Sequence, residues 1–154
     1  PNEKWTLALD ILRIEYGELN ELSNSILNSL GPGAPPLGSS NGSAFGWEDN
    51  QTNYKFGASY AVSPDLTLRA GYEYGERPND NGIDATSLSI LAPNAEHRAS
   101  IGLSWQTRQS GVMHLGYGHF FKDTYRGPSA IFPGATESVE AYVHTLYIGW
   151  TINY

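Results

Sequence analysis

The sequence predicts an all-β protein, a transmembrane antiparallel β-barrel of which this chain forms one part. Three observations predict it. Apolar and polar residues alternate with a period of two in six separate segments, which is the pattern of strands with one apolar face. Short and long connections alternate between these segments, and aromatic residues gather toward the segment ends.

The composition limits the classes of protein to which the chain can belong. Charged residues make up 16% of its 154 residues, well below the roughly 25% of an average soluble protein, whereas it has 17 Gly, 10 Tyr and 4 Trp. No apolar run reaches about 18 residues, so the sequence contains no transmembrane helix. The net charge of −7 argues against a nucleic-acid partner. Because there is no Cys, disulfides and thiolate metal sites are excluded.

The first predicted strand covers residues 5–16 and alternates from Trp5 to Ile11. The alternation then shifts by one residue, which predicts a β-bulge near Ile11–Leu12. The other five predicted strands are 53–62, 66–76, 97–107, 112–121 and 139–154. Each strand reaches the roughly 9–11 residues that a tilted strand needs to cross a bilayer.

The last strand shows the alternation most clearly. Every second residue from Tyr142 is large and mostly apolar, ending in Trp150, Ile152 and Tyr154, and the residues between are small or polar. We expect the large side chains to face lipid. Trp150 and Tyr154 are expected to lie in the aromatic girdle on the periplasmic side, and the terminal aromatic resembles the signal that barrel-assembly machinery reads.

The connections predict a single partial barrel domain over residues 1–154. Tight turns lie at 63–65 and 108–111, and long outer loops lie at 17–52, 77–96 and 122–138. Short periplasmic turns and long outer loops are typical of outer-membrane barrels. Within the first loop, the apolar spacing of residues 18–30 predicts a short amphipathic helix.

A soluble β-sandwich would also alternate apolar and polar residues. Two features favour the barrel over this alternative. The polar face carries some charge but is rich in Gly and Ser, as expected of a wet lumen, and the aromatic residues lie where lipid meets water.

Four stretches together resemble one membrane-protein family. They are "EKWTLALDI" (3–11), "NYKFGASYAVSPDLTLRAGYEYGERP" (53–78), "LAPNAEHRASIGLSW" (91–105) and the aromatic chain end. In order and spacing they are similar to the carboxy-terminal part of the outer-membrane long-chain fatty-acid and hydrocarbon transporters (FadL/TodX). The resemblance implies a monomeric fourteen-stranded barrel, with this chain as its last six strands.

The parts of the family that carry the transport mechanism have no counterpart in these residues. They are the amino-terminal hatch and the early strand whose kink opens sideways into the membrane. Six strands cannot close a lumen, and the two open sheet edges would leave backbone groups unpaired in lipid. We therefore expect that the remainder of the barrel, or another chain, completes the wall.

The function that the resemblance implies is passive uptake of hydrophobic compounds, either long-chain fatty acids or aromatic hydrocarbons, across the outer membrane of a Gram-negative bacterium. The expected partners are the hydrophobic ligand and membrane lipid or lipopolysaccharide, and no cofactor is implied. An adhesin or receptor barrel acting through its outer loops is the alternative from another functional class.

Two cations are candidate ligand-binding residues. Lys55 and Arg69 fall on the inward face of one hairpin, where a cation in a partly dry lumen would attract a fatty-acid carboxylate. The alternative is a structural ladder in which Asp10 or Glu73 pairs with these cations.

No catalytic or metal-binding residue is predicted. On the last strand, His144 shares its face with Leu146, so a nucleophile is missing beside this base. The four His residues show no metal-ligand spacing. The stretch 79–84 offers oxygen ligands for Ca²⁺, but without a complete binding loop a polar turn is the favoured interpretation.

Overall fold

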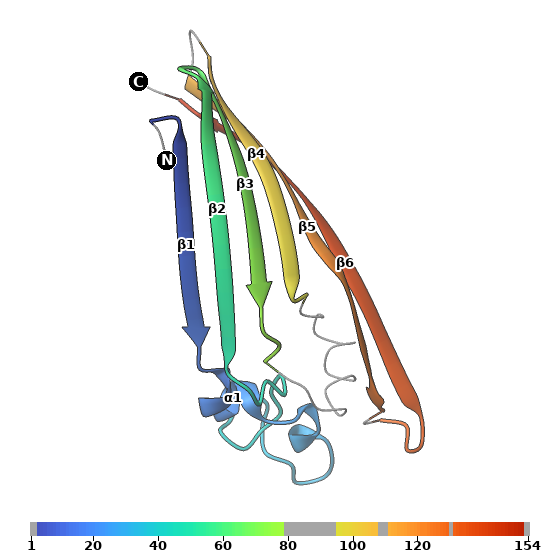
Figure 1. The fold of residues 1–154 in the computed structure, drawn as a ribbon. Coiled ribbons are helices and arrows are strands. Elements are labelled where there is room, and N and C mark those ends of the chain that lie inside the picture. The colour runs from blue at the N-terminus through green and yellow to red at the C-terminus, as the bar shows by residue number, and fades with distance from the viewer. Residues whose placement is uncertain (1–2, 79–94, 108–110, 130, 153–154) are drawn as a thin grey trace.

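The chain forms one six-stranded antiparallel sheet in which every strand pairs with its neighbours in sequence (Figure 1). The structure is a computed structural model that describes residues 3–78, 95–107, 111–129 and 131–152. The strands are β1 (Trp5–Ile14), β2 (Gln51–Ser63), β3 (Leu66–Gly75), β4 (His97–Thr107), β5 (Gly111–Pro128) and β6 (Thr136–Thr151). Among the described residues there is no second sheet of the kind that a β-sandwich requires.

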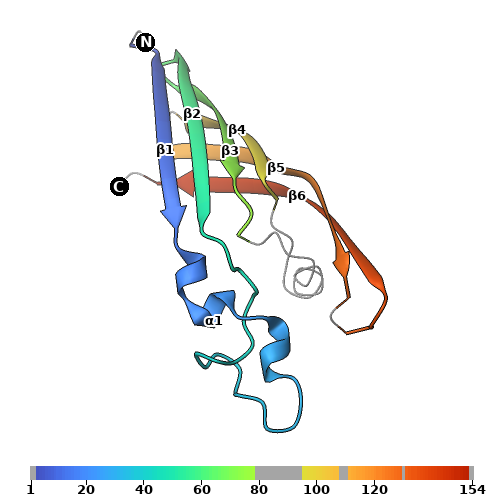
Figure 2. The same cartoon turned by 60° about the horizontal axis from the view of Figure 1, so that its bottom comes forward.

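All the strands run between two ends of the sheet that differ in their connections. At one end β2 turns into β3 through two residues, and β1 begins and β6 ends at this turn end (Figure 1). The other end, called the loop end here, carries the long connection between β1 and β2. Figure 2 shows that the strand direction rotates strongly from β1 to β6, as the twist of strands of L-residues requires.

Antiparallel pairing gives the sheet two chemically different faces, because residues that lie opposite each other point the same way. The outer face carries the large apolar residues of all six strands, for example Leu9, Phe56, Ile101 and Leu146. Their side chains are uncovered, with Leu9 73% and Leu146 74% exposed. A face this apolar and this exposed needs an apolar solvent.

The inner face is mainly small and polar. One row of opposed residues crosses it at mid-height: Ala8, Gly57, Gly71, Ser100, Gly118 and Thr145. The neighbouring rows carry the charged residues described below.

The expected bulge near Ile11–Leu12 is wrong. The β1–β2 register is unbroken from Trp5 to Ile14, so Leu12 simply lies on the inner face. Irregularities occur instead between Ala61 and Ser63 in β2 and between Phe120 and Asp123 in β5.

The expectation of a long loop at 122–138 is also wrong. β5 continues to Pro128 and β6 begins at Thr136, so the two strands form a hairpin that extends past the other strands (Figure 1). The sequence is polar here because this part of the hairpin lies beyond the apolar band, where no lipid selects apolar residues.

The first loop contains three short helical pieces instead of one amphipathic helix. They are η1 (Tyr16–Glu18), α1 (Asn20–Ser23) and η2 (Ile26–Ser29). Asn24 and Ser25 have extended backbone angles, and the Ser25 hydroxyl accepts a hydrogen bond from the Leu27 N–H at 3.3 Å. A Ser that caps a new helical turn ends the previous one. No helix among the described residues is long and apolar enough to cross a membrane.

Candidate functional site on the inner face of the sheet

A row of charged residues crosses the inner face near the loop end. Asp10, Lys55, Glu73 and Arg98 lie opposite one another on β1 to β4. Lys55 Nζ lies 3.9 Å from Asp10 Oδ2, and Arg98 Nη1 lies 3.1 Å from Glu73 Oε2. The Arg98 guanidinium also lies 4.1 Å from the ring centroid of Phe120 on β5. The row therefore crosses five strands: four side chains of alternating charge come first, and an aromatic ring follows.

A second row of polar contacts lies toward the turn end. Arg69 on β3 donates a hydrogen bond to the hydroxyl of Ser104 on β4, which lies 2.7 Å from Nδ1 of His114 on β5. Nε2 of His114 lies 3.2 Å from the hydroxyl of Thr151 on β6. Ser104 is buried, and this row of contacts ties four strands together on the inner face.

The contact between Ser104 and His114 has the distance of a nucleophile and its base, but its surroundings do not suit that chemistry. The far nitrogen of the imidazole meets a Thr hydroxyl and not a carboxylate that would orient the ring and stabilise its charge. The Ser104 oxygen is also engaged by the Arg69 guanidinium. The arrangement therefore acts as a wall-stiffening network.

A hollow of about 400 Å³ lies on the inner face beside Arg69. Its floor is made by small residues of neighbouring strands, among them Gly57, Ser59, Gly71 and Gly102. Gly102 lies directly opposite Arg69. Because these residues have little or no side chain, a ligand in the lumen can approach the wall closely at this height.

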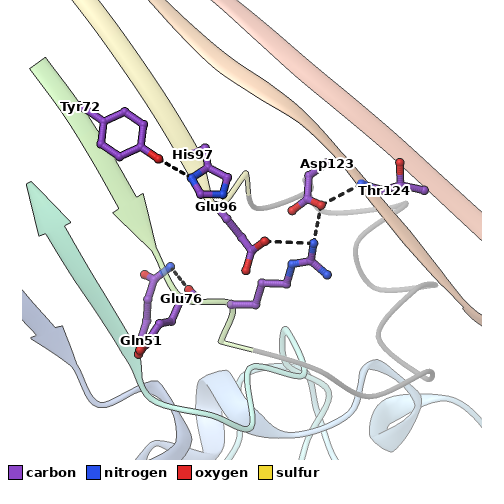
Figure 3. Close-up of polar contacts among 8 residues, drawn as sticks. Gln51, Tyr72, Glu76, Glu96, His97, Asp123 and Thr124 are labelled. Carbon is purple, nitrogen blue, oxygen red and sulfur yellow. Dashed lines mark hydrogen bonds and ion pairs between the residues drawn. The ribbon is translucent and has the colours of Figure 1, made fainter.

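Arg77 organises the loop end of the wall, where the polypeptide leaves β3, and Figure 3 labels its two acidic partners, Glu96 and Asp123. Its Nη2 donates to Glu96 Oε2 at 3.3 Å and to Asp123 Oδ1 on β5, and its guanidinium lies 5.1 Å from the ring centroid of Tyr125. The three charged side chains are between 16% and 28% exposed. One cation thus joins the residue before β4 to the extended part of β5.

Hydrogen bonds from β2 also hold the segment that follows β3 at this loop end. The Gln51 side chain donates to the Glu76 carbonyl at 2.8 Å, and the Thr52 N–H donates to the Glu76 carboxylate at 3.2 Å. Next to this region lies a pocket of about 220 Å³, lined by Asn53, Glu73, Glu96, Arg98 and Asp123 among others. The loop end of the sheet is thus polar, and most of its charged side chains pair with one another.

Aromatic residues form two bands on the outer face of the sheet. Trp5, Tyr60, Trp105 and Trp150 lie toward the turn end. Toward the loop end lies a belt of tyrosine and histidine: Tyr54, Tyr72, Tyr74, His97, Tyr117, His119, Tyr142 and His144. Between them an apolar hollow of about 740 Å³ is lined mostly by Ala, Leu and Ile, and lipid acyl chains can fill it.

Within the belt, histidines bond to tyrosines. Tyr72 Oη lies 2.6 Å from His97 Nδ1, and Tyr117 Oη lies 2.6 Å from His144 Nδ1. His119 and His144 lie opposite each other, with stacked rings 4.7 Å apart. The alternation of the sequence already places these three histidines on the apolar face, but the pattern of one strand does not contain their partners.

The candidate residues from the sequence lie as follows. Lys55 and Arg69 are both on the inner face, but the Gly57–Gly71 pair lies between them, so the structure does not bring them together. Trp150 lies on the outer face of β6 opposite Met113. Tyr154 and the possible Ca²⁺ ligands at 79–84 lie outside the described residues. Within the described ranges, no group of three or more His, Asp or Glu residues could hold a metal ion.

Comparison with known proteins places this geometry in a family. The family model for outer membrane protein transport proteins (OMPP1/FadL/TodX) matches residues 1–140. The solved structure titled "TodX monoaromatic hydrocarbon channel deltaS2 mutant" resembles the chain with a TM-score of 0.62 at 17% sequence identity. The similarity covers 94% of this chain and 31% of that channel, and at this identity it shows the fold alone. No curated protein gives a match.

These findings agree with the two-faced sheet. The chain has the strands of a partial barrel and spans about a third of the length of the channel it resembles. The family consists of outer-membrane transport proteins and not of enzymes, which confirms the fold class and the outer-membrane location that the sequence predicts. The chain belongs to the OMPP1/FadL/TodX family of outer membrane protein transport proteins.

Proposed function

We propose that the intact protein takes up hydrophobic compounds passively across the outer membrane, and that this chain supplies six strands of its wall. The observation that supports this most is the match of the family model over residues 1–140. The sheet agrees with it, because one face is apolar and uncovered while the other is small and polar. An adhesin or receptor barrel is not favoured by this match.

Among hydrophobic compounds, we propose that those bearing a carboxylate, such as long-chain fatty acids, are substrates, with Arg69 contacting the carboxylate. Arg69 donates a hydrogen bond to the neutral hydroxyl of Ser104, and among the described residues no ion pair compensates its charge. Arg69 also borders the hollow of about 400 Å³ whose floor is glycine-rich. A guanidinium in this setting has donors left for a second acceptor.

Lys55 is a weaker candidate for the same role. Its ammonium already lies 3.9 Å from the Asp10 carboxylate, and Glu73 lies opposite it on β3. A ligand carboxylate would have to compete with both acids. This placement supports the structural ladder for Lys55 and leaves Arg69 as the preferred cation.

Aromatic hydrocarbons are the second candidate substrate class, since the solved structure that the chain resembles is named as a monoaromatic hydrocarbon channel. Uptake of radiolabelled oleate and toluene should be measured in cells that lack their own transporter and express the intact gene. We expect oleate uptake to exceed that of cells with an empty vector. If neither compound enters faster than in the empty-vector cells, the proposed function is wrong.

A further inference from the structure

The outer face of the β5–β6 hairpin carries cations just beyond the tyrosine–histidine belt. The irregularity between Phe120 and Asp123 sets two β5 residues, Phe121 and Lys122, against Tyr142 of β6. Phe121 packs edge-on against His119, with centroids 4.8 Å apart, so the bulge side chains point outward with the belt. A bulge re-aims side chains in this way.

Beyond the bulge, the outer face continues with polar and charged residues. Thr124 lies opposite Glu140, and Arg126 lies opposite Ser138. Lys122 and Arg126 are both exposed. Lys122 Nζ lies 2.7 Å from Glu140 Oε2, and the Arg126 charge also acts on that carboxylate. The patch formed by Lys122, Arg126 and Glu140 therefore has a net charge of +1, although the whole chain carries −7.

The height of the patch matches an anionic lipid headgroup. At about 3.4 Å per residue, Glu140 and Ser138 lie roughly 7 Å and 14 Å along β6 from Tyr142 in the belt. Tyrosine belts mark the level where acyl chains meet headgroups. Lys122 and Arg126 thus lie where the phosphates of the outer leaflet lipid begin, on the side of the wall that faces lipid.

We propose that this patch binds the lipid A phosphates of lipopolysaccharide. Lysine serves as a point charge for phosphate, and arginine can bind two of its oxygens at once. The hydroxyls of Ser138 and Tyr142 lie on the same face as further donors, whereas the Thr124 hydroxyl already bonds to Glu140. Glu140 limits the affinity, because its carboxylate repels phosphate and competes for Lys122. The inference rests on the orientation of the hairpin in the outer membrane and not on which compound is transported.

The test is a titration of rough lipopolysaccharide, with both lipid A phosphates, into the intact protein held in phosphatidylcholine nanodiscs. The double variant Lys122→Gln/Arg126→Gln should bind it more weakly, by about fivefold for each exposed cation removed. Lys4→Gln, which removes a cation at the turn end of β1, is the control for charge alone and should not change the affinity.

Two further arms make the assignment specific. Glu140→Gln should tighten binding several-fold, and lipopolysaccharide stripped of its lipid A phosphates should bind the native protein as weakly as the double variant binds the complete lipid. Equal affinity of the native protein and the double variant would overturn the proposal. So would displacement by millimolar inorganic phosphate, which would indicate a site for any free anion. Oleate uptake is measured separately, so failure of one experiment does not imply failure of the other.

Discussion

Arg69 and Arg77 differ in how the surrounding side chains compensate their charge, and this difference indicates different roles for the two residues. Arg77 is held by two carboxylates and lies over an aromatic ring. Arg69 meets a hydroxyl beside a glycine-rich hollow. The first arrangement suits a structural joint, and the second suits a contact with a ligand.

Replacing Arg69 should affect substrates with a carboxylate selectively. In Arg69→Gln we expect oleate uptake to fall by about tenfold to a hundredfold, because one charged hydrogen bond contributes about 1.5–3 kcal/mol, while toluene uptake stays unchanged. Lys55→Gln is the comparison and should have the smaller effect, because Asp10 already pairs with Lys55. An equal loss for oleate and toluene in Arg69→Gln would mean that Arg69 only supports the wall.

Replacing Arg77 should destabilise the loop end of the wall. Arg77→Ala leaves the carboxylates of Glu96 and Asp123 close together without their shared cation. We expect a loss of about 1–3 kcal/mol in the free energy of unfolding, measured by urea titration of the intact protein in lipid vesicles. Arg77→Lys, which keeps the charge but not the fork of donors, should lose less. Unchanged stability in Arg77→Ala would contradict a structural role.

The orientation of single residues followed from the sequence, whereas their partners did not. Alternation alone put Lys55 and Arg69 on the inward face, because the side-chain period of a strand is two. The contact between Ser104 and His114 depends on the register of β4 and β5, which a strand read alone does not contain. Counting residues outward from the Thr107–Gly111 pair joins Ser104 to His114, so a predicted turn one residue shorter than 108–111 would have found their contact.

At the scale of elements, the start of β5 beside β6 depends on one glycine. Gly111 has a φ of 115°, and a Cβ there would overlap the carbonyl oxygen of Thr151 on β6. Gly111→Ala should therefore cost about 1–3 kcal/mol from backbone strain alone, seen as a lower urea midpoint. Gly57→Ala is the matched control, since its Cβ would meet only Ala8 Cβ at 3.8 Å. If the two variants were equally stable, the close approach of Gly111 to Thr151 and its positive φ would be wrong.

The extended β5–β6 hairpin should respond to acid through Glu140. The hydrogen bond and charge of Lys122 hold the pKa of the Glu140 carboxyl below its usual value, and this part of the hairpin lies beyond the lipid-facing band. A carboxyl whose pKa is lower in the folded protein adds stability above the pKa of the unfolded chain. That contribution is lost as the pH falls through the lower, folded value.

Hydrogen exchange of the hairpin amides, corrected for the intrinsic effect of pH, should therefore show less protection at pH 3 than at pH 7. Because the pair is exposed, the expected change is small and confined to this hairpin. In Glu140→Gln the corrected protection should not change with pH. A variant that responds to acid as the native protein does would rule out Glu140 as the cause.

The strands were predictable within the bilayer, where lipid selects apolar side chains. The strand extensions and helical pieces outside the bilayer were less predictable. All six strands show apolar alternation within the bilayer band, and that alternation located them. The extensions of β5 and β6 read as a loop because a polar hairpin in water has no apolar face to mark it. The sequence predicts one helix between β1 and β2 and not three short pieces, because spaced leucines carry no information on where Ser25 ends a turn.

At the scale of the whole molecule, the six strands form one continuous wall with an apolar face toward lipid and a polar face toward water. Each strand contributes to both surfaces, so residues next to each other in sequence must experience different solvents. The chain contains no Cys, so single cysteines can be introduced into these strands against a background without thiols from this part of the protein.

The most direct test is the labelling of single cysteines at neighbouring positions of β4 in the intact protein in outer membranes. Ser100 lies on the inner face and Ile101 on the outer face, where it is 64% exposed. A small, charged maleimide should label Ser100→Cys readily and leave Ile101→Cys nearly unlabelled, and a nitroxide attached at Ile101→Cys should report a lipid environment. Equal labelling of both positions, or labelling of Ile101→Cys alone, would contradict the assignment of the polar face to the lumen and the apolar face to lipid.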